Sequence, residues 1–546
     1  MRSILSDSSL ISQVEAIDKL SSILGSLKET EIELSSSLGK ISSRDVFSPI
    51  DLPSFSRSTV DGYAVKSLCT PGKFSLKGKV NIGESPQMKV ESCEDVVEVD
   101  TGSVIPEGAD AVVKIEDTRS EDGKIIIPSK VDFGSNVGWI GSDLPSGIKV
   151  LRSDSLITPE IIGLLSALGL TKVHVYSTPK AFIVSTGNEL VSPGEIIEEG
   201  KVYESNLYYL KSALIEDGME VIGTRTVRDD YDAIKDAILK GVKTADLVVT
   251  TGGTSAGERD YVYRVVKEMG EMIFHGIRFK PGKPTFVGRI NDIPIIGLPG
   301  NMVSTIMVYR KIVRPSLERK FKIKARERIT VKAKSLLEIK ADKKRFTYIP
   351  VLLFRKSSEY YALPLKFDSY MIGTFSMANG YIGLSEGSFV NEEDEVTVEV
   401  TNPPGDTTIV GEEDPAVPST GIYYPLGSLP ALKMLEKKVG DVLVLSSLVK
   451  VPDDFDLEIK REILSNGQGA EIGYDEWVSL SKYVKNPSVK LRYRSLIKRF
   501  IGKAKVIGPS SYVQSGNEVG TESLFVIAVT EMGKQLIKSF KVNKST

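Results

Sequence analysis

The feature that most constrains the fold of this chain is the stretch LVVTTGGTSAGERDY at Leu247–Tyr261. Its first three residues are the large apolar and β-branched types that favour a strand. The glycines that follow permit positive φ and bring backbone N–H groups close to a ligand. A helix from Glu258 to about Met269 would point the positive end of its dipole at the same place. The stretch predicts a strand, an oxyanion-binding loop and a helix, in that order.

Asp260 falls in the first turn of this predicted helix. A carboxylate there repels a bare phosphate, so it suggests a divalent cation or a reaction of an oxyanion at this place. The alternative interpretation is structural. Asp260 would then only favour the positive end of the helix, and the glycines would form an ordinary βα turn.

Residues 179–325 alternate between strand-like and helix-like segments. Alternation of this kind predicts a three-layer α/β/α domain with a mostly parallel sheet, which binds ligands at the carboxyl ends of its strands. The loops Thr186–Glu189 and Thr250–Asp260 should therefore face one crevice. Lys280 and Lys283 lie on a proline-rich turn suited to an anion, although solvated surface lysines are the alternative. Gly297–Asn301 ends another apolar strand.

The remaining residues divide into further segments. Apolar residues at helical spacing and a helix start at Pro159 predict a helical N-terminal domain of residues 1–48 and 148–178, whose helices pack on one another. Short strands and turns predict an inserted β-rich domain at 49–147. Residues 326–402 are rich in strands, 403–419 have the composition of a linker, and 420–546 predict an accessory α/β domain.

Charge and composition exclude several classes of function. The net charge of -2 gives no reason to expect nucleic acid as a partner. With only Cys69 and Cys93 and only two histidines, a structural zinc site or a disulfide framework is not expected. No leader-like or membrane-spanning apolar segment is evident, so we expect a cytoplasmic protein. Carboxylates, lysines, hydroxyls and backbone amides remain to carry the chemistry.

Eight motifs, taken together and in order, resemble the molybdopterin molybdenumtransferase (MoeA) family, which also includes the C-terminal part of gephyrin. The resemblance covers about residues 10–400. The motifs are Ser58–Val65, Thr101-Gly102, Gly141-Ser142-Asp143, Ser185–Leu190, the Gly-Gly loop through Asp260, Lys280–Pro284, Gly297–Asn301 and Gly373–Gly380.

The resemblance implies a chemistry and an assembly. Family members insert molybdate into adenylylated molybdopterin and release AMP with the help of a divalent ion such as Mg²⁺. They are homodimers whose active site lies between the sheet domain of one subunit and the β-rich insertion of the other, and residues 326–402 would form a β-barrel-like domain. Tungstate is an alternative substrate, and handover from a molybdopterin adenylyltransferase is a possible partnership.

The resemblance also implies roles for particular residues. The carboxylates that would hold the metal ion or position water are Asp61, Asp143, Glu189, Asp230 and Asp260, of which Asp61, Glu189 and Asp260 would be metal ligands. The residues that would bind the pterin substrate or its oxyanions are Thr101, Thr186, Gly187, Gly252, Gly253, Ser255, Gly257, Lys280, Lys283, Pro299, Asn301 and Ser376. Asp229 adjoins Asp230, and either could instead cap a helix.

Four features depart from the family's pattern. The family usually has Asp at the positions of Asn188 and Glu204, Pro at Met302, and an arginine-rich, acidic segment at residues 138–142. Losing arginines removes bidentate phosphate donors that lysine does not replace.

Two other functions stay open. A molybdopterin adenylyltransferase also has a Gly-Gly loop followed by Asp, but the β-rich insertion and the domain after 326 argue against it. The other alternative is a non-catalytic carrier or scaffold for molybdopterin.

Overall fold

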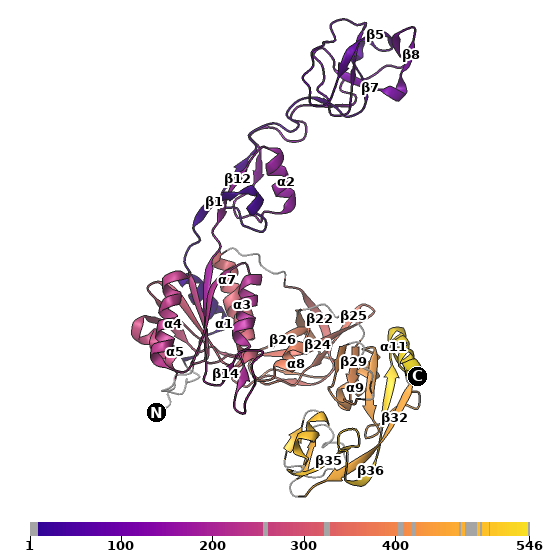
Figure 1. Ribbon diagram of the computed structural model, residues 1–546. Coiled ribbons are helices and arrows are strands. Elements are labelled where there is room, and N and C mark those ends of the chain that lie inside the picture. The colour runs from indigo at the N-terminus through magenta and orange to yellow at the C-terminus, as the bar shows by residue number, and fades with distance from the viewer. Residues whose placement is uncertain are drawn as a thin grey trace. The chain divides into compact units, whose positions relative to one another are not determined.

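The computed structural model describes residues 9–254, 260–321, 328–401, 408–415, 417, 422–468, 471–474, 489–491, 494–501 and 503–543. The chain forms two compact units (Figure 1). The first comprises Met1–Gly25, Lys180–Lys320 and Ala325–Thr546, and the second comprises Ser26–Pro179 with Phe321–Lys324. Among the described residues, no helix is long and apolar enough to cross a membrane.

The predicted α/β domain is present in the first unit. Its elements are α1 (Gln13–Ile23), β13 (Lys180–Thr186), β14 (Leu190–Val191), β15 (Val202–Tyr203), α3 (Asn206–Glu216), β16 (Glu220–Val227), α4 (Tyr231–Thr244), β17 (Leu247–Thr251), α5 (Tyr261–Met269), β18 (Glu271–His275), β19 (Phe279–Lys280), β20 (Phe286–Ile290), β21 (Ile293–Leu298), α6 (Met302–Val308), a π-helical turn (Tyr309–Val313) and α7 (Arg314–Phe321).

Six of these strands form one sheet in the order β16-β13-β17-β21-β20-β18, in which β16, β13, β17 and β21 are parallel. Helices α4 and α5 cover one face of the sheet and α3 the other (Figure 1). Strand β17 is wholly buried, which explains its continuous apolar and β-branched sequence. The chain runs from β13 to β16 on one side and then crosses back to β17. The carboxyl ends of β13 and β17 thus flank a topological switch point, where ligands bind in such sheets.

The N-terminal helix does not lie where the sequence suggested. We expected the helices of residues 10–40 to pack with α2, but α1 contacts β21 and the π-helical turn of the α/β domain. The helix expected near residues 32–38 is instead strand β1 (Glu29–Glu33), followed by a short 3-10 turn. Thr and Ile alternate with three Glu in β1, and the antiparallel partner β12 (Lys172–Tyr176) offers Lys172 and His174 to these carboxylates. This cross-strand pairing outweighs the helical spacing of the leucines.

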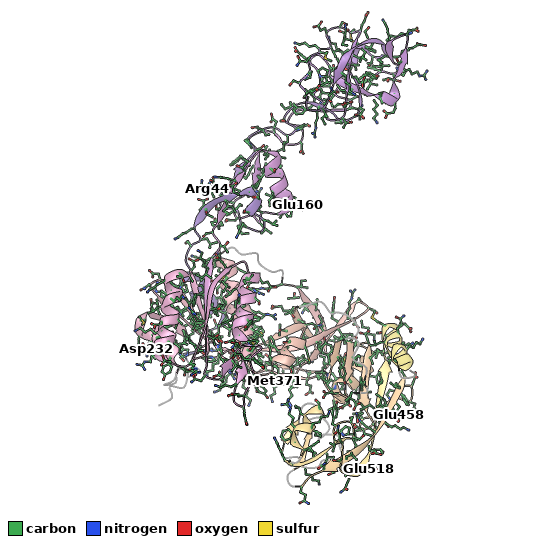
Figure 2. The ribbon with its side chains drawn as sticks, in the orientation of Figure 1. Arg44, Glu160, Asp232, Met371, Glu458 and Glu518 are labelled. Atoms are coloured by element: carbon green, nitrogen blue, oxygen red, sulfur yellow. A yellow bond between two sulfur atoms is a disulfide. The ribbon has the colours of Figure 1, made fainter. Side chains whose placement is uncertain are left out.

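The second unit contains the β-rich insertion and short elements around it. The elements not yet given are β2 (Val46–Phe47), β3 (Arg57–Ser58), β4 (Gly62–Val65), β5 (Gly72–Val80), β6 (Asp95–Val99), β7 (Ala111–Lys114), β8 (Arg119–Glu121), β9 (Lys124–Ile127), β10 (Val137–Gly138), β11 (Lys149–Leu151) and α2 (Pro159–Ala167). Strands β4 to β9 form a six-stranded sheet with an apolar cluster on each face. Helix α2 begins at Pro159 with Glu160 in its first turn, as the sequence predicts (Figure 2).

The sequence predicted no disulfide framework, but the structure contains one disulfide bond. Cys69 and Cys93 are bonded to one another. They are 24 residues apart in sequence, with Cys69 at the end of a 3-10 turn before β5 and Cys93 just before β6. Because β5 and β6 are hydrogen-bonded neighbours in the sheet, the fold brings the two thiols together. A count of cysteines could not reveal that pairing.

A barrel-like domain follows, in the segment that the sequence marks as rich in strands and that the family resemblance implied to be barrel-like. Its elements are β22 (Thr330–Ser335), β23 (Ile339–Lys340), β24 (Phe346–Lys356), β25 (Glu359–Pro364), α8 (Ile372–Met377), β26 (Gly380–Leu384), β27 (Phe389–Val390) and β28 (Glu395–Val400). Strands β24, β25, β22, β28 and β26 pair in a ring that β26 closes on β24. Strand β19 of the α/β domain adds to this sheet beside β24, so the two domains share a strand edge.

The C-terminal region is an α/β domain that begins earlier than composition suggested. Its elements are β29 (Thr408–Gly411), β30 (Ile422–Tyr424), α9 (Ser428–Lys437), β31 (Val442–Ser446), β32 (Leu457–Asn466), β33 (Glu471–Tyr474), β34 (Val489–Leu491), a 3-10 helix (Arg494–Phe500), β35 (Lys505–Pro509), β36 (Asn517–Ala528) and α11 (Glu531–Asn543). Strand β29 is buried, although it lies in the expected linker. The ion pairs Lys433–Glu392 and Lys437–Glu393, 3.1 and 2.6 Å long, fasten α9 to the barrel-like domain.

Candidate functional site

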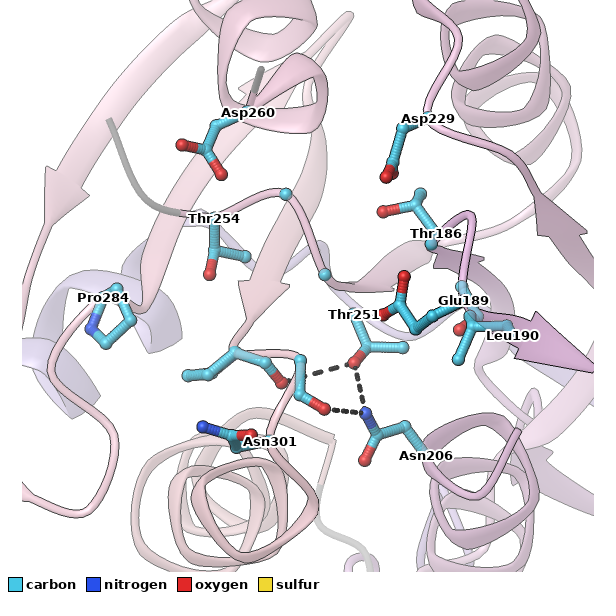
Figure 3. A pocket seen from close by; sticks show the side chains of 16 residues that line it. Thr186, Glu189, Leu190, Asn206, Asp229, Thr251, Thr254, Asp260, Pro284 and Asn301 are labelled. Carbon is cyan, nitrogen blue, oxygen red and sulfur yellow. Dashed lines mark hydrogen bonds between the residues drawn. The ribbon is translucent and has the colours of Figure 1, made fainter. Parts of the chain in front are cut away.

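A pocket of about 290 Å³ opens at the carboxyl ends of β13, β17 and β21, at the predicted switch point (Figure 3). The expected crevice between the two loops is therefore present. The residues that line the pocket are Ser185, Thr186, Gly187, Glu189, Leu190, Asn206, Asp229, Thr251, Gly252, Gly253, Thr254, Asp260, Pro284, Pro299, Gly300 and Asn301.

Two glycines shape the floor of this pocket. Gly252 has φ +89°, and a Cβ atom built there would lie 2.4 Å from the backbone oxygen of Thr186. Gly253 has φ +58°. A Cβ built on Gly300 would lie 3.8 Å from the Cα of Gly252. The Thr186 loop thus approaches Gly252 more closely than a side chain would permit, so glycine is required at position 252 for this geometry.

Three polar side chains at or beside the pocket hold buried atoms that lack a hydrogen-bond partner. These atoms, identified within the described part of the chain, are Thr186 Oγ1, Asn206 Oδ1 and Glu204 Oε2. In two of these side chains, Asn206 and Glu204, the other polar atom does form hydrogen bonds. Asn206 Nδ2 donates to Thr251 Oγ1 at 2.9 Å and to the Gly300 carbonyl at 2.7 Å (Figure 3), and Glu204 Oε1 accepts from Leu207 N. Because orphaned buried polar atoms are costly, they indicate polar partners supplied by a ligand.

Three carboxylates line the pocket, those of Glu189, Asp229 and Asp260 (Figure 3). Asp260 precedes α5, yet its side chain makes no capping hydrogen bond to that helix. Asp260 is nevertheless the N-cap residue of α5, so the alternative in which its charge favours the positive end of the helix stays open beside a role in the pocket. The side chain of Asp230, by contrast, does make a capping bond, because its Oδ1 accepts from Ala233 N at 2.9 Å and it is the N-cap of α4.

The structure thus distinguishes two adjacent aspartates that the sequence left ambiguous. Asp229, not Asp230, lines the pocket. The backbone N–H of Asp229 donates to Asn188 Oδ1 at 3.2 Å, and the N–H of Asn188 donates to Asp229 Oδ2 at 3.4 Å. Asn188, where the family pattern has Asp, therefore holds the loop that carries Asp229 in place. An Asp at position 188 would accept the same bond from Asp229 N.

The carboxylates of the pocket are the candidate ligands for a divalent ion. Carboxylate oxygens are the ligands that Mg²⁺ prefers. Over the residues that the structure describes, no group of three or more His, Cys, Asp or Glu side chains lies close enough to hold one metal ion. At most two of the carboxylates of Glu189, Asp229 and Asp260 could therefore bind the same ion. Substrate oxygens and water would have to complete its coordination, as is usual for Mg²⁺.

Eight of the residues predicted from sequence meet in this pocket. They are Thr186, Gly187, Glu189, Gly252, Gly253, Asp260, Pro299 and Asn301. Asn301 also donates to Ser369 Oγ of the barrel-like domain at 3.0 Å.

Other predicted residues lie elsewhere. Lys280 and Lys283 are not among the lining residues, although Lys283 adjoins the lining residue Pro284. Lys280 forms a long ion pair of 3.9 Å with Asp342. Ser376 is exposed on α8. Ser255 and Gly257 fall outside the described residues.

The predicted residues of the β-rich insertion belong to the second unit. Both the backbone N–H and the hydroxyl of Thr101 donate to Asp61 Oδ1, at 2.6 and 2.8 Å. The backbone hydrogen bond, followed by that of the hydroxyl, lowers the pKa of the Asp61 carboxyl below its ordinary value. Asp143 is exposed, and its N–H donates to the Leu52 carbonyl. Asp61 and Thr101 therefore act as one hydrogen-bonded pair, with the carboxylate ionised.

Sequence reasoning missed several residues that line the pocket. Asn206 lies at the start of a helix-like segment, which gives no sign of a pocket, and the sequence leaves open which of Asp229 and Asp230 is functional. The remaining missed residues are Ser185, Leu190, Thr251, Thr254, Pro284 and Gly300. Position alone could have identified most of them, because residues at the carboxyl end of a parallel strand face the crevice.

His275 contacts the Gly-Gly loop at Thr254. Its Nε2 lies 3.0 Å from the Thr254 carbonyl, and its ring packs on Tyr263 with centroids 4.6 Å apart. Burial lowers the pKa of His275, while the Thr254 hydrogen bond opposes that change. A neutral imidazole that donates from Nε2 fits this environment.

We expect stability to fall on acidification because of His275. The unfolded chain protonates histidine near its ordinary pKa of about 6.5, whereas the folded chain resists until a lower pH. The contribution is thus complete above about 6.5 and is lost as the pH falls through the lowered pKa. Between pH 7.5 and 5, the unfolding midpoint should drop by about 2 °C more in the wild type than in His275→Gln, which keeps an N–H donor. Equal drops in a calorimetric scan would contradict this role.

The fold and the pocket together define a class of protein, a three-layer α/β domain with a Gly-Gly loop built to hold an anionic ligand. Three family models match the chain within residues 11–401. A "MoeA N-terminal region (domain I and II)" model matches 11–169, a "probable molybdopterin binding domain" model matches 182–319, and a "MoeA C-terminal region (domain IV)" model matches 332–401.

Relatives and a solved structure agree with these matches. A molybdopterin molybdenumtransferase of Haemophilus influenzae is 35% identical over 287 residues, 52% of this chain and 71% of that protein. A putative molybdopterin biosynthesis protein of Methanocaldococcus jannaschii is 33% identical over 56% of this chain and 78% of its own length. The MoeA crystal structure from Pyrococcus horikoshii superposes with a TM-score of 0.64 at 31% identity, covering 72% of this chain and 99% of that one. The chain belongs to the molybdopterin molybdenumtransferase (MoeA) family.

Proposed function

We propose that this chain is a transferase of molybdenum cofactor biosynthesis that inserts molybdate into adenylylated molybdopterin and releases AMP. The observation that carries the proposal is the pocket at the switch point. It combines the Gly252-Gly253 loop, orphaned polar atoms on Thr186 and Asn206, and three carboxylates, in a chain of this family.

The donors of the pocket serve the oxyanions of the substrate. The Thr186 hydroxyl is buried beside Gly252 and is free to donate to a phosphate or molybdate oxygen. Backbone amides of the Gly-Gly loop are preorganised for the same purpose. Lys280, Lys283 and Ser255 stay part of the proposal as further donors, with Gly257 in the loop and Ser376 as a contact from the barrel-like domain.

The carboxylates serve the cation and the water. One or two of the carboxylates of Glu189, Asp229 and Asp260 would hold a divalent ion such as Mg²⁺ together with substrate oxygens and water, and Asp61 and Asp143 stay proposed as contributors from the β-rich insertion. Such an ion supplies charge stabilisation for the departing AMP phosphate. Asp230 is better assigned to capping α4, and its catalytic role passes to Asp229 in this proposal.

The wider setting follows from the family resemblance. A homodimer with shared active sites, a cytoplasmic location and handover of the adenylylated pterin from an adenylyltransferase all belong to the proposal. Tungstate has the same tetrahedral shape and charge as molybdate, so both are retained as substrates.

The test is a single incubation of the full-length protein with adenylylated molybdopterin, molybdate and magnesium. We expect AMP release that depends on the oxyanion and stops when EDTA removes the divalent ion. A parallel incubation with tungstate measures the preference between the two oxyanions. Binding of the adenylylated pterin without AMP release would favour the carrier alternative. Formation of adenylylated molybdopterin from ATP would favour the adenylyltransferase.

A further inference from the structure

Two aromatic side chains, one exposed and one half-buried, form a pair on the β-rich insertion. The rings of Phe133 and Trp139 are stacked, with centroids 5.5 Å apart and planes 14° from parallel. Phe133 is 72% exposed, although large apolar side chains are usually covered. The neighbouring Ile140 is 52% exposed. We call Phe133 and Trp139 the aromatic platform.

Hydrogen bonds join the turn that carries the platform to residues 110–112, at the start of β7. Gly134 N donates to the Asp110 carbonyl and Val112 N donates to the Ser135 carbonyl, both at 2.9 Å. Asn136 Nδ2 donates to the Val112 carbonyl at 2.8 Å. Gly134 has φ +80°, and a Cβ atom there would lie 3.2 Å from the Trp139 indole nitrogen. The indole thus lies against a glycine, on a turn that is ordered before any ligand arrives.

The platform lies close to the Asp61–Thr101 pair in the same unit. Strand β10 leads into Trp139 and pairs with β3, where Val137 faces Ser58. The Ser58 carbonyl in turn accepts from Gly102 N, next to Thr101. Two strand spacings, about 10 Å, thus separate Val137 from Gly102 along this ladder, and Trp139 and Thr101 lie within two residues of these positions. The rings of the platform and an ionised carboxylate at this separation can contact one ligand of nucleotide size.

Charged residues of both signs lie near the platform, and its sequence neighbours Asp132 and Asp143 are acidic. Residues 138–142 carry no charged side chain before Asp143, where the family pattern has arginines. Arg57 nevertheless supplies a positive charge beside this segment. It is exposed on β3, and its Cγ would lie 3.6 Å from a Cβ built on Gly138. This arrangement replaces part of the phosphate recognition by a surface for stacking.

We propose that the aromatic platform stacks with a planar heteroaromatic ring of the adenylylated pterin substrate, either the pterin or the adenine. The inference rests on the proposed function for the identity of the ligand. Offset stacking suits these rings, because the two side chains cover one face of each other and the outer face of Phe133 is open. Arg57 is placed for the phosphate beside that ring.

The test uses Trp139 as its own reporter. The sequence has only two tryptophans, so Trp477→Phe leaves Trp139 as the single indole in the full-length protein. A soluble pterin and AMP are titrated separately while indole emission is recorded. Quenching by the pterin alone assigns the pterin ring, and quenching by AMP alone assigns the adenine. If both quench, the ligand with the lower Kd is assigned.

Substitutions at Phe133 show whether stacking is responsible. Phe133→Leu should weaken binding of the quenching ligand about 5- to 150-fold, the range for loss of one stacked ring, and Phe133→Tyr should restore it. Leu68→Ala is the matched control, because Leu68 is 93% exposed in the same domain, and it should leave Kd unchanged.

The outcomes separate this inference from the proposed function. Quenching that depends on Phe133 would support the platform even if the protein released no AMP. If neither ligand alters the emission up to millimolar concentration, or if Phe133→Leu binds as well as the parent, the inference is overturned. It is also overturned if the emission changes with protein concentration but not with ligand, since the platform would then contact a second copy of the chain.

Discussion

Asp260→Asn is expected to lose about 100-fold in AMP release while binding the adenylylated pterin as well as the parent or more tightly. Asn keeps the size of the side chain and one acceptor oxygen but removes the negative charge. Under the proposed function, that charge would repel the phosphate in the ground state and serve a cation or water during the reaction. Calorimetry of binding and a single-turnover assay of AMP release would measure the two quantities separately.

Asp230→Asn is the matched control for this substitution. Asp230 is exposed and caps α4 outside the pocket, so Asn, itself a good N-cap, should change neither binding nor AMP release. If Asp260→Asn fails to bind the pterin, or releases AMP at the parental rate, the role assigned to Asp260 is wrong.

Gly252→Ala should weaken binding of the adenylylated pterin by about 100-fold. The new Cβ would lie 2.4 Å from the Thr186 carbonyl and 2.8 Å from its hydroxyl, and both are too short. The strand end or the loop must therefore shift, and a displacement near 1 Å at such a site costs about 100-fold. Positive φ adds strain to any residue other than glycine.

Gly194→Ala separates this collision from backbone strain. Gly194 has φ +97°, close to that of Gly252, but a Cβ there meets nothing within 4 Å. Gly194→Ala should lower the unfolding midpoint slightly and leave the Kd of the pterin unchanged. Equal weakening in both variants would show that strain, and not the approach of Thr186, explains the effect.

The α/β domain was predictable because its signal is local. A buried strand such as β17 shows its nature in five successive residues, and the Gly-Gly pair after it marks the end of the strand. Asp260 was identified for the same reason, since it follows that loop by a short, fixed interval. The position of Glu189 after the glycine of β13's loop gave a comparable signal.

Other features depend on contacts between distant segments, and sequence reasoning missed them. Asn206 reads as a helix start, and only the approach of Thr251 and Gly300 shows that it faces the pocket. The roles of Asp229 and Asp230 become distinct only because the backbone N–H of Ala233 donates to the carboxylate of Asp230. Strand β1 and the Cys69–Cys93 bond exist because of partners more than 20 residues away. The sequence around each of these residues does not predict such distant partners.

The C-terminal domain illustrates how composition can mislead. Glu412, Glu413 and Asp414 were assigned to a solvated linker. Glu412 instead accepts from the N–H and hydroxyl of Ser428 at the start of α9, and Glu413 accepts from the hydroxyl of Ser495. Asp414 pairs with the buried Arg461. Three successive carboxylates thus join separate elements of this domain, and their charges are met by specific donors.

The path of the chain through β1 and β12 makes residues 26–179 an insertion within the α/β domain. Helix α1 belongs to the α/β domain, yet residues 26–179 intervene before that domain resumes at β13. The chain leaves and returns through two paired strands, with Glu29 opposite Tyr176, so exit and entry are about 5 Å apart. The α/β domain is thus a host and residues 26–179 are its guest. One short turn in place of the guest would restore a continuous host, and the guest could be exchanged between relatives as a single cassette.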